Sequence, residues 1–485
     1  MGKSQPDKLA QDALKKRNPK QAISYLSNRY ANGGQIEYLI ACIDIMHLFH
    51  EDIEFFHSLL WTIKRLVHTR GASLSVKEHD KILYKKLALK YFRFIDYLGH
   101  ELNIPEENKA NTTPKRLLII GQQFLRPPYS ITMCMLEFAR IARIGGFEDI
   151  KLFITNEYPE KPASTFHESM WAVQSTVIGD ENYDFKGDQI SIHSHPKQGI
   201  SKQSIQDNIA YIEEYAPDAV LLVGDNIILG DVCAKFLPTM CWPISQTLSA
   251  SLAHTHYYRS EIEPMQQIDW KRLKHEPPKM LKQDFDLLTE GENQASLSRD
   301  DLKLPEDAFA FVLVGGRIEQ EITLEFRKLL FAILEASPNA YLVIVGPVSQ
   351  SLKLEFALYQ ERIRWVRFID DLRSAMSNCD AFLNPPRQGG GNSAYWAMLE
   401  GLPILTLDDC DVQMTIREGA AVKTLEELQA LAILVMNDEN VRNDYIEKSK
   451  ARIASFRTEA ESGSNLMSGV KYCIEEFNTR LLCNV

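Results

Sequence analysis

The sequence lacks a C-x-x-C pair, an apolar run of about 18 residues, and a G-x-G-x-x-G that follows a predicted strand. The missing glycine fingerprint disfavours a dinucleotide dehydrogenase, and the missing apolar run predicts that no segment crosses a membrane. The N-terminal residues also lack the apolar core of a secretory signal. Most of the eight cysteines stand in apolar settings, so we expect reduced, mostly buried thiols in a cytoplasmic protein.

Positive charge is in deficit, with 54 Lys and Arg against 65 Asp and Glu and a net charge of −11. This balance excludes a general nucleic-acid-binding surface. Residues 1–110 differ, because they hold 17 Lys and Arg against 13 Asp and Glu, hence +4. That excess leaves open a peripheral contact with a membrane surface or an acidic acceptor, beside the plainer alternative of a solvated helical face.

The 485 residues suggest about three domains of roughly 150 residues each. Residues up to about 110 carry apolar side chains at three- and four-residue spacing, which predicts helices throughout. The polar stretch 103–115, with two prolines, marks the end of this part. We therefore predict an all-helical domain over 1–112, which binds an acceptor or a protein partner.

Strands and helices alternate after this boundary, which predicts parallel βαβ units and an α/β fold. One set of strands is expected within 113–290 and a second within 291–455, followed by closing helices over 456–485. Residues 260–307 are charged and aperiodic, so we expect an interdomain connection there. The predicted strands are 116–124, 150–155, 188–194 and 218–224, then 309–316, 340–346, 364–370 and 380–383.

The stretch "NPPRQGGGNSAYWAMLEGLP" (384–403) places three glycines and an arginine between a strand and a helix. Asn392 or Ser393 is placed to cap the helix. Gly389–Gly391 would let backbone N–H groups converge at the positive end of the helix dipole, with Arg387 beside them. Such a loop is suited to a phosphate, and the alternative is a glycine-rich turn that binds nothing.

The second alternating region resembles the donor-binding half of the GT-B glycosyltransferases. The residues that carry the resemblance are "FVLVGGRIEQEITLEFRKLLFAILEASPNAYLVIVG" and "VRFIDDLRSAMSNCDAFLNPPRQGGGNSAYWAMLEGLPILTL". The resemblance covers about 115–485 and implies two Rossmann-like domains that face a cleft. With a helical domain ahead of this core, the chain is also similar to bacterial cytoplasmic N-glycosyltransferases.

The glycine stretch resembles the corresponding motif of two families within this fold. Retaining family-4 enzymes carry two glutamates eight positions apart, where this chain has Gln388 and Trp396. They also place a lysine after the Gly-Arg turn, where this chain has "IEQEIT". The stretch is as similar to the family-41 type, whose enzymes invert, so either stereochemical outcome stays open.

The resemblance implies that the donor's diphosphate is neutralised by cations and a helix terminus, with no metal and no other cofactor. It assigns this work to Arg387, Arg317 and the backbone of Gly389, Gly390, Gly391, Asn392 and Ser393. The alternatives are an exposed loop arginine at 387 and a surface turn residue at 317. Glu400 suits either a ribose hydroxyl or solvent.

Inverting transfer needs a general base near the acceptor hydroxyl. The candidates are His193, His195 and Asp225, which stand at or just after two predicted strands, and none is singled out. A zinc site is not expected at these histidines or at His254 and His256, because no third ligand follows at a recognisable spacing.

We therefore expect a glycosyltransferase that moves a sugar from a nucleotide sugar, UDP-linked by preference, to a glycan or protein acceptor. One alternative keeps the fold but makes the chain a catalytically inactive partner of an active transferase. Another is a sugar-nucleotide epimerase, although an epimerase has no need of a helical acceptor domain.

Overall fold

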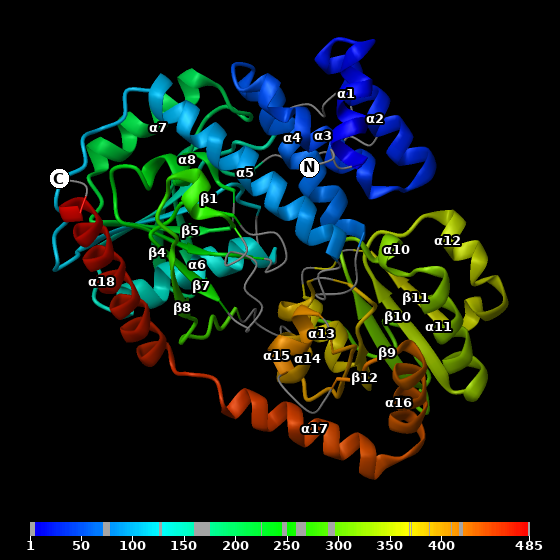
Figure 1. The fold of residues 1–485 in the computed structure, drawn as a ribbon. Helices are drawn as coiled ribbons and strands as arrows, with labels where there is room; N and C mark the ends of the chain where they lie inside the picture. The colour runs from blue at the N-terminus through cyan, green and yellow to red at the C-terminus, as the bar shows by residue number, and fades with distance from the viewer. Residues whose placement is uncertain are drawn as a thin grey trace. The chain divides into compact units, whose positions relative to one another are not determined.

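The computed structural model describes residues 5–70, 78–125, 129–159, 175–224, 226–244, 250–258, 268–289, 296–367, 369, 371–387, 389–408, 410–416 and 421–483. The chain forms two compact units (Figure 1). The first unit contains residues 1–67, 76–288 and 457–485, and the second contains 68–75 and 289–456. The first unit thus holds residues for which the sequence predicts two domains, 1–112 and 113–290, and the closing helices 456–485, and that finer division stays a prediction.

The N-terminal part of the first unit is helical, as predicted. Its helices are α1 (Gln5–Lys15), α2 (Pro19–Gly33), α3 (Ile36–Ile45), α4 (Ile53–Arg70) and α5 (Glu78–Glu101), with the 3-10 turn η1 (Met46–Phe49). Local sequence sets these ends: Asn18 and Gln21 form a capping box at α2, and Gly34 ends α2 in the left-handed conformation. No described helix combines the length and the apolar composition that crossing a membrane requires.

The first unit is built on an eight-stranded sheet in the order β3-β4-β2-β1-β5-β6-β7-β8. All neighbouring strands are parallel except β3, which pairs antiparallel with β4. The strands are β1 (Arg116–Gly121), β2 (Asp149–Ile154), β3 (Gly179–Phe185), β4 (Asp188–Ser194), β5 (Ala219–Val223), β6 (Thr239–Trp242), β7 (Thr255–Tyr258) and β8 (Lys279–Lys282).

The helices of this unit are α6 (Ser130–Ile144), α7 (Lys202–Tyr215), α8 (Ile228–Cys233), α9 (Trp270–Leu273) and α18 (Glu459–Cys483). Because α9 and β8 lie within 260–307, the prediction of a bare connection there is wrong for those residues. The helical part is joined to the sheet by a buried bond, since Tyr91 of α5 donates to Asp231 of α8. Ser251 donates to the same carboxylate at 2.6 Å.

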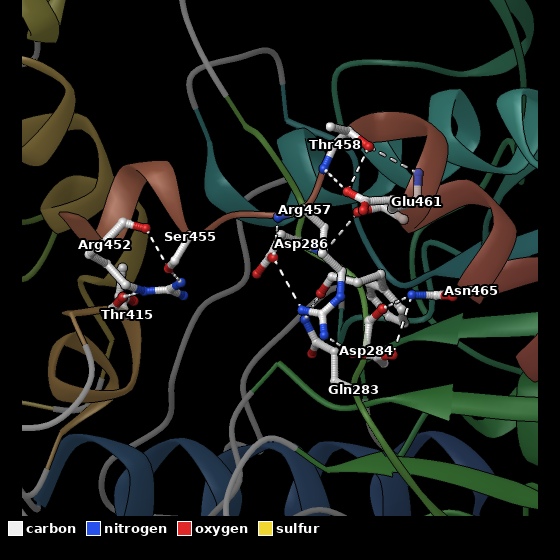
Figure 2. A network of polar contacts seen from close by, with 12 residues as sticks. Gln283, Asp284, Asp286, Thr415, Arg452, Ser455, Arg457, Thr458, Glu461 and Asn465 are labelled. Atoms are coloured by element: carbon white, nitrogen blue, oxygen red, sulfur yellow. Dashed lines mark hydrogen bonds and ion pairs between the residues drawn. The ribbon is translucent and has the colours of Figure 1, made fainter. Parts of the chain in front are cut away.

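The last helix, α18, packs against α6 of the same unit. Gly145 and Gly463 permit this, because a Cβ on Gly145 would lie 2.4 Å from the carbonyl oxygen of Gly463. Figure 2 shows how the chain re-enters the unit: the backbone N–H of Arg457 donates to Asp286 at 2.9 Å, and its side chain pairs with Asp284. Seven of the eight cysteines are buried, which confirms the burial predicted for most of them.

The second unit holds a five-stranded parallel sheet in the order β11-β10-β9-β12-β13. Its strands are β9 (Phe309–Val314), β10 (Ala340–Val345), β11 (Ile363–Val366), β12 (Ala381–Leu383) and β13 (Ile404–Leu405). Its helices are α10 (Ile318–Glu321), α11 (Leu324–Ala336), α12 (Gln350–Glu355), α13 (Leu372–Ser377), α14 (Gly391–Leu399), α15 (Asp411–Ile416), α16 (Leu425–Asn437) and α17 (Glu439–Ala454), with the 3-10 turn η3 (Ala357–Arg362).

Both sheets are doubly wound, which confirms the predicted α/β class. In the second sheet the strand order reverses between β9 and β12, and in the first sheet it reverses between β1 and β5. In open α/β sheets ligands bind outside the carboxyl ends of the strands at such a reversal. These two points are therefore where a site is expected in each unit.

Candidate functional site

The reversal point of the second sheet is occupied by Arg387. The strand β9 ends at Val314 and β12 ends at Leu383, and Arg387 follows β12 by four residues. Its Nη1 donates to the carbonyl oxygen of Val314 at 2.6 Å, and its Nε donates to Oδ1 of Asn384 at 2.9 Å. The guanidinium therefore links the carboxyl ends of two adjacent strands.

A buried carboxylate holds the same arginine. Glu321, the last residue of α10, places Oε2 2.9 Å from Nη1 of Arg387. Its other oxygen, Oε1, lies 3.3 Å from Nε of Arg317. Arg387 is only 5% exposed. Arg387 is thus not an exposed loop arginine, and the turn at Arg317 is joined to it through one shared glutamate.

Two glycines leave the space that this arginine occupies, and a third leaves space for Thr415. A Cβ on Gly390 would lie 2.6 Å from Nη2 of Arg387. A Cβ on Gly315 would lie 2.6 Å from Nη1 of Arg387 and 2.8 Å from Oε2 of Glu321. At Gly391 the conflict would be with Oγ1 of Thr415, at 2.8 Å. The bare backbone therefore makes room for side chains of the site, a reason that the sequence analysis did not include.

The glycine turn also sets the start of α14. Gly389 and Gly390 have φ angles of 100° and 91°, which side-chain-bearing residues rarely adopt. Gly390 is the N-cap and no side chain caps the helix, so the prediction of a cap at Asn392 or Ser393 is wrong. Both residues lie in the first turn, where backbone N–H groups have no partner within the helix and the dipole is positive.

Two side-chain donors at this place have no hydrogen-bond partner among the residues that the structure describes. They are Nη2 of Arg387 and Nδ2 of Asn392, and both atoms are buried. A buried donor left without an acceptor costs about 1–3 kcal/mol. An anion at the start of α14 would supply the missing acceptor.

Glu400, one residue beyond α14, is ion-paired rather than solvated. Its carboxylate lies 2.6 Å from Nε of Arg373 in α13. Asp371 caps α13 by accepting from the backbone N–H of Ser374 at 3.0 Å. Its neighbour at 370 lies outside the described residues. The ribose contact of Glu400 stays a prediction.

The reversal point of the first sheet carries amide and carboxyl groups. Gln122, just after β1, donates to Oε1 of Glu157 at 2.9 Å and to the carbonyl oxygen of Asn226 at 3.2 Å. Glu157 also accepts from the backbone N–H of Ile228 at 2.9 Å. Burial raises the pKa of the Glu157 carboxyl, although these hydrogen bonds oppose the effect. Glu157 thus accepts hydrogen bonds from Gln122, which follows β1, and from Ile228, which follows β5, and it links the segments beyond these two strands.

Two asparagines at these strand ends adopt strained backbone conformations. Asn156 follows β2 with φ 50°, and Asn226 follows β5 with φ 54°. Residues other than glycine rarely adopt such angles, and they gather at functional sites. The Asn156 side chain donates to Oγ of Ser194 and to the carbonyl oxygen of His195, which fixes the end of β4.

Two of the three predicted bases, His193 and His195, lie on or just after β4, two strands away from β1. His193 belongs to β4, and its ring stacks on Tyr211 of α7 at 3.7 Å while Nδ1 lies 3.1 Å from Asp180. Burial lowers the pKa of His193, more than Asp180 raises it. His195 is buried, with Nδ1 2.9 Å from the carbonyl oxygen of Lys197. Asp225 lies outside the described residues. The catalytic roles of all three stay predictions.

The second pair of histidines is internal. His254 and His256 are buried, and burial lowers the pKa of His254 to about 3. Over the described ranges, no group of three or more His, Cys, Asp or Glu side chains is placed to hold a metal ion.

Sequence reasoning missed Glu321 and Asn384, which hold Arg387, and Gln122 and Glu157 at the first sheet. Glu157 stands two residues after the predicted strand 150–155, which was a usable signal. Gln122 lies within the predicted strand 116–124 and follows β1 only because β1 ends at Gly121. Glu321 gave none, because its partner lies 66 positions away and meets it only through the strand order.

This chain is similar to known proteins in the sequence of residues 297–452 and in the fold of a larger part of the chain. Residues 297–452 match the family model of the group 1 glycosyl transferases. A mutant O-GlcNAc transferase from Thermobaculum terrenum aligns with TM-score 0.53 and 12% identity, over 99% of this chain and 100% of that one. No curated protein sequence matches the chain.

Two further solved structures are similar over about three quarters of the chain. A trehalose-6-phosphate structure from E. coli bound with UDP-2-fluoro glucose aligns with TM-score 0.50 and 9% identity, over 73% of this chain and 99% of that one. OtsA in its apo form aligns with TM-score 0.51 and 10% identity, over 74% and 99%. At such identities the likeness concerns the fold.

Proposed function

We propose that this chain, whose fold is that of the GT-B glycosyltransferases and whose residues 297–452 match the group 1 glycosyl transferase model, transfers a sugar from a UDP-linked donor to a glycan or protein acceptor. The donor's diphosphate is held at the start of α14, beside Arg387 and Arg317. UDP is preferred because one structure similar in fold is bound with UDP-2-fluoro glucose. The proposal includes the cytoplasmic location predicted from the thiols.

The observation that carries the proposal is the group of donors at the reversal point of the second sheet. Buried Nη2 of Arg387, buried Nδ2 of Asn392 and the first turn of α14 come together there, within the matched residues 297–452. Charge-assisted hydrogen bonds to phosphate are about twice as strong as neutral ones. A diphosphate would therefore satisfy donors that the described residues leave unpaired, and no metal is required.

The acceptor is proposed to bind on the first unit, where α4 supports such a role. One face of α4 packs Phe56 and Ile63 into the helical core. The other face carries His57, Ser58 and Trp61, each with a buried polar atom that has no hydrogen-bond partner in the described part of the chain. The ring of Trp61 meets Tyr158 edge-on at 5.5 Å, just beyond the carboxyl end of β2.

A polar helix face that is buried without partners is unusual, because such groups are nearly always hydrogen-bonded. Aromatic rings beside unpaired donors and acceptors are typical of sites for polar ligands. We therefore assign the helical part to acceptor binding. A protein partner or a peripheral membrane contact through residues 1–112 is the alternative assignment.

The experiment that tests the proposal is calorimetric binding of UDP, GDP and ADP without metal. We expect UDP to bind best, and Arg387→Ala to weaken it about ten- to a hundredfold through the loss of one charge-assisted contact. Arg362→Ala is the matched control, because Arg362 of the same unit donates to the carbonyl oxygens of Leu334 and Ser337, at the other end of the strands.

Arg387→Ala leaves Glu321 without its closest cation, so thermal unfolding of each variant must accompany the titrations. Arg387→Lys keeps the charge but loses the planar guanidinium, and we expect this variant to bind UDP more weakly as well. If wild type binds no nucleotide, the donor site is refuted and the inactive-partner alternative takes its place. Binding that is followed by sugar transfer to water or to a glycan supports the transferase.

A further inference from the structure

We propose that Glu321 is a positioning residue of the donor site, whose carboxylate directs two arginines toward the turn at Gly389 and Gly390. The inference rests on the proposed nucleotide-sugar site and adds a residue to it. Glu321 does not contact the donor in this account. It acts through Arg387 and Arg317, each of which binds one of its oxygens.

The two oxygens of Glu321 are used separately. Oε2 accepts from Nη1 of Arg387 at 2.9 Å, and Oε1 accepts from Nε of Arg317 at 3.3 Å. The Glu321 side chain is 9% exposed, so its hydrogen bonds are little weakened by water. Arg317 and Glu321 stand four positions apart at the two ends of the short helix α10, which sets their separation.

Each guanidinium lies beside one glycine of the turn. The position of a Cβ on Gly390 is 2.6 Å from Nη2 of Arg387. The position of a Cβ on Gly389 is 3.8 Å from Nη2 of Arg317, and no other described atom outside Gly389 and its two chain neighbours lies within 4 Å of it. Arg387 therefore fills the space that a side chain at position 390 would need, whereas Arg317 lies in ordinary contact distance of position 389.

The hydrogen bonds of Arg387 use Nε and Nη1, and they leave Nη2, which lies beside Gly390, without a partner among the described residues. Nε is engaged by Asn384, and Nη1 is engaged by Val314 and Glu321. A planar guanidinium held at two of its nitrogens cannot rotate freely. Glu321 thus contributes to fixing where Nη2 points.

Electrostatics alone predicts the opposite effect of this glutamate. A buried negative charge near a diphosphate site repels the ligand, so removing it should strengthen binding. If Glu321 instead positions the two arginines, removing its charge should weaken binding, because the cations lose their orientation. The sign of the change in affinity separates the two accounts.

The test is calorimetric binding of UDP to wild type and to Glu321→Gln, without metal. We expect the variant to bind UDP at least tenfold more weakly, with a raised KM for the UDP-sugar and a nearly unchanged kcat. Glu355→Gln is the matched control, because it removes one negative charge from the same unit, where Glu355 pairs with Arg327. The control should bind UDP as wild type does.

Equal or tighter UDP binding by Glu321→Gln would overturn the inference and leave the donor site intact. Failure of wild type to bind UDP would instead refute the proposed function. If Glu321→Gln does not fold, Arg317→Lys provides the same test, since lysine keeps the charge but cannot donate through Nε to the glutamate. Wild-type UDP affinity in Arg317→Lys would then overturn the inference.

Discussion

Replacing Gly390 by alanine should displace Arg387 and thereby weaken nucleotide binding. The added Cβ would lie 2.6 Å from Nη2 and 2.8 Å from Nε of the arginine. Real Cβ atoms do not approach this closely, so either the turn or the guanidinium must move. The guanidinium is held by Asn384, Val314 and Glu321, so its movement disturbs all of these bonds.

The cost has two parts that a second glycine separates. A residue other than glycine at a φ of 91° costs roughly 1–2 kcal/mol in backbone strain. Gly401→Ala carries the same kind of strain at a φ of 77°, and beyond its chain neighbours no atom of the described residues lies within 4 Å of the new Cβ. The clash at Gly390 adds the disturbance of a charge-assisted bond, about 1.5–3 kcal/mol, which corresponds to roughly ten- to a hundredfold in affinity.

The assay compares UDP dissociation constants and thermal unfolding midpoints of wild type, Gly390→Ala and Gly401→Ala. We expect both variants to unfold at lower temperature and only Gly390→Ala to lose UDP affinity. Equal affinities in all three proteins would show that Arg387 does not bind the phosphates from its buried position. Equal losses in both variants would mean that general destabilisation, not the arginine, controls binding.

Two predictions concern the first unit. Burial raises the pKa of Asp231 to about 7, so between its ordinary 3.8 and about 7 the folded protein keeps a proton that the unfolded chain has released. The free energy of unfolding of wild type should therefore fall as the pH rises through that window, by up to about 1.4 kcal/mol per pH unit, and Asp231→Asn should lack this fall. If the difference in urea unfolding free energy between wild type and Asp231→Asn stays constant from pH 5 to 7, this prediction is wrong. Trp61→Phe keeps an aromatic ring but removes the unpaired Nε1 donor, so the KM for the acceptor should rise severalfold while UDP affinity stays unchanged; an unchanged acceptor KM contradicts the assignment of α4.

Local patterns were sufficient to predict most strands of the second unit. The alternation of apolar runs and amphipathic segments predicts β9, β10, β11 and β12, because parallel strands buried on both faces are continuously apolar. The capping of α13 by Asp371 is equally local, since a carboxylate before a helix accepts its first N–H groups. These features depend on neighbours within a few residues along the chain.

Features set by tertiary pairing could not be predicted in the same way. The pair of Glu321 and Arg387 exists because β9 and β12 are adjacent, which the sequence does not state. His193 lies in β4, which has the bounds of the predicted strand 188–194, but its stacking on Tyr211 of α7 depends on tertiary packing. The short strands β6, β7 and β8 each have four residues, too few to show a clear period.

Trp396 illustrates how the donor site differs from a family-4 pattern. Its indole is 5% exposed and donates to the carbonyl oxygen of Thr289 at 2.8 Å, so the place of the second family-4 glutamate holds a core residue. One turn further along, Glu400 is paired with Arg373. A buried ion pair such as Arg387 and Glu321 adds little net stability, because desolvation offsets the attraction. On the proposed function, the pair is better explained by the orientation of the arginine, because Glu321 holds the guanidinium of Arg387 toward the donor's diphosphate. The chain does this without the two glutamates of the family-4 pattern.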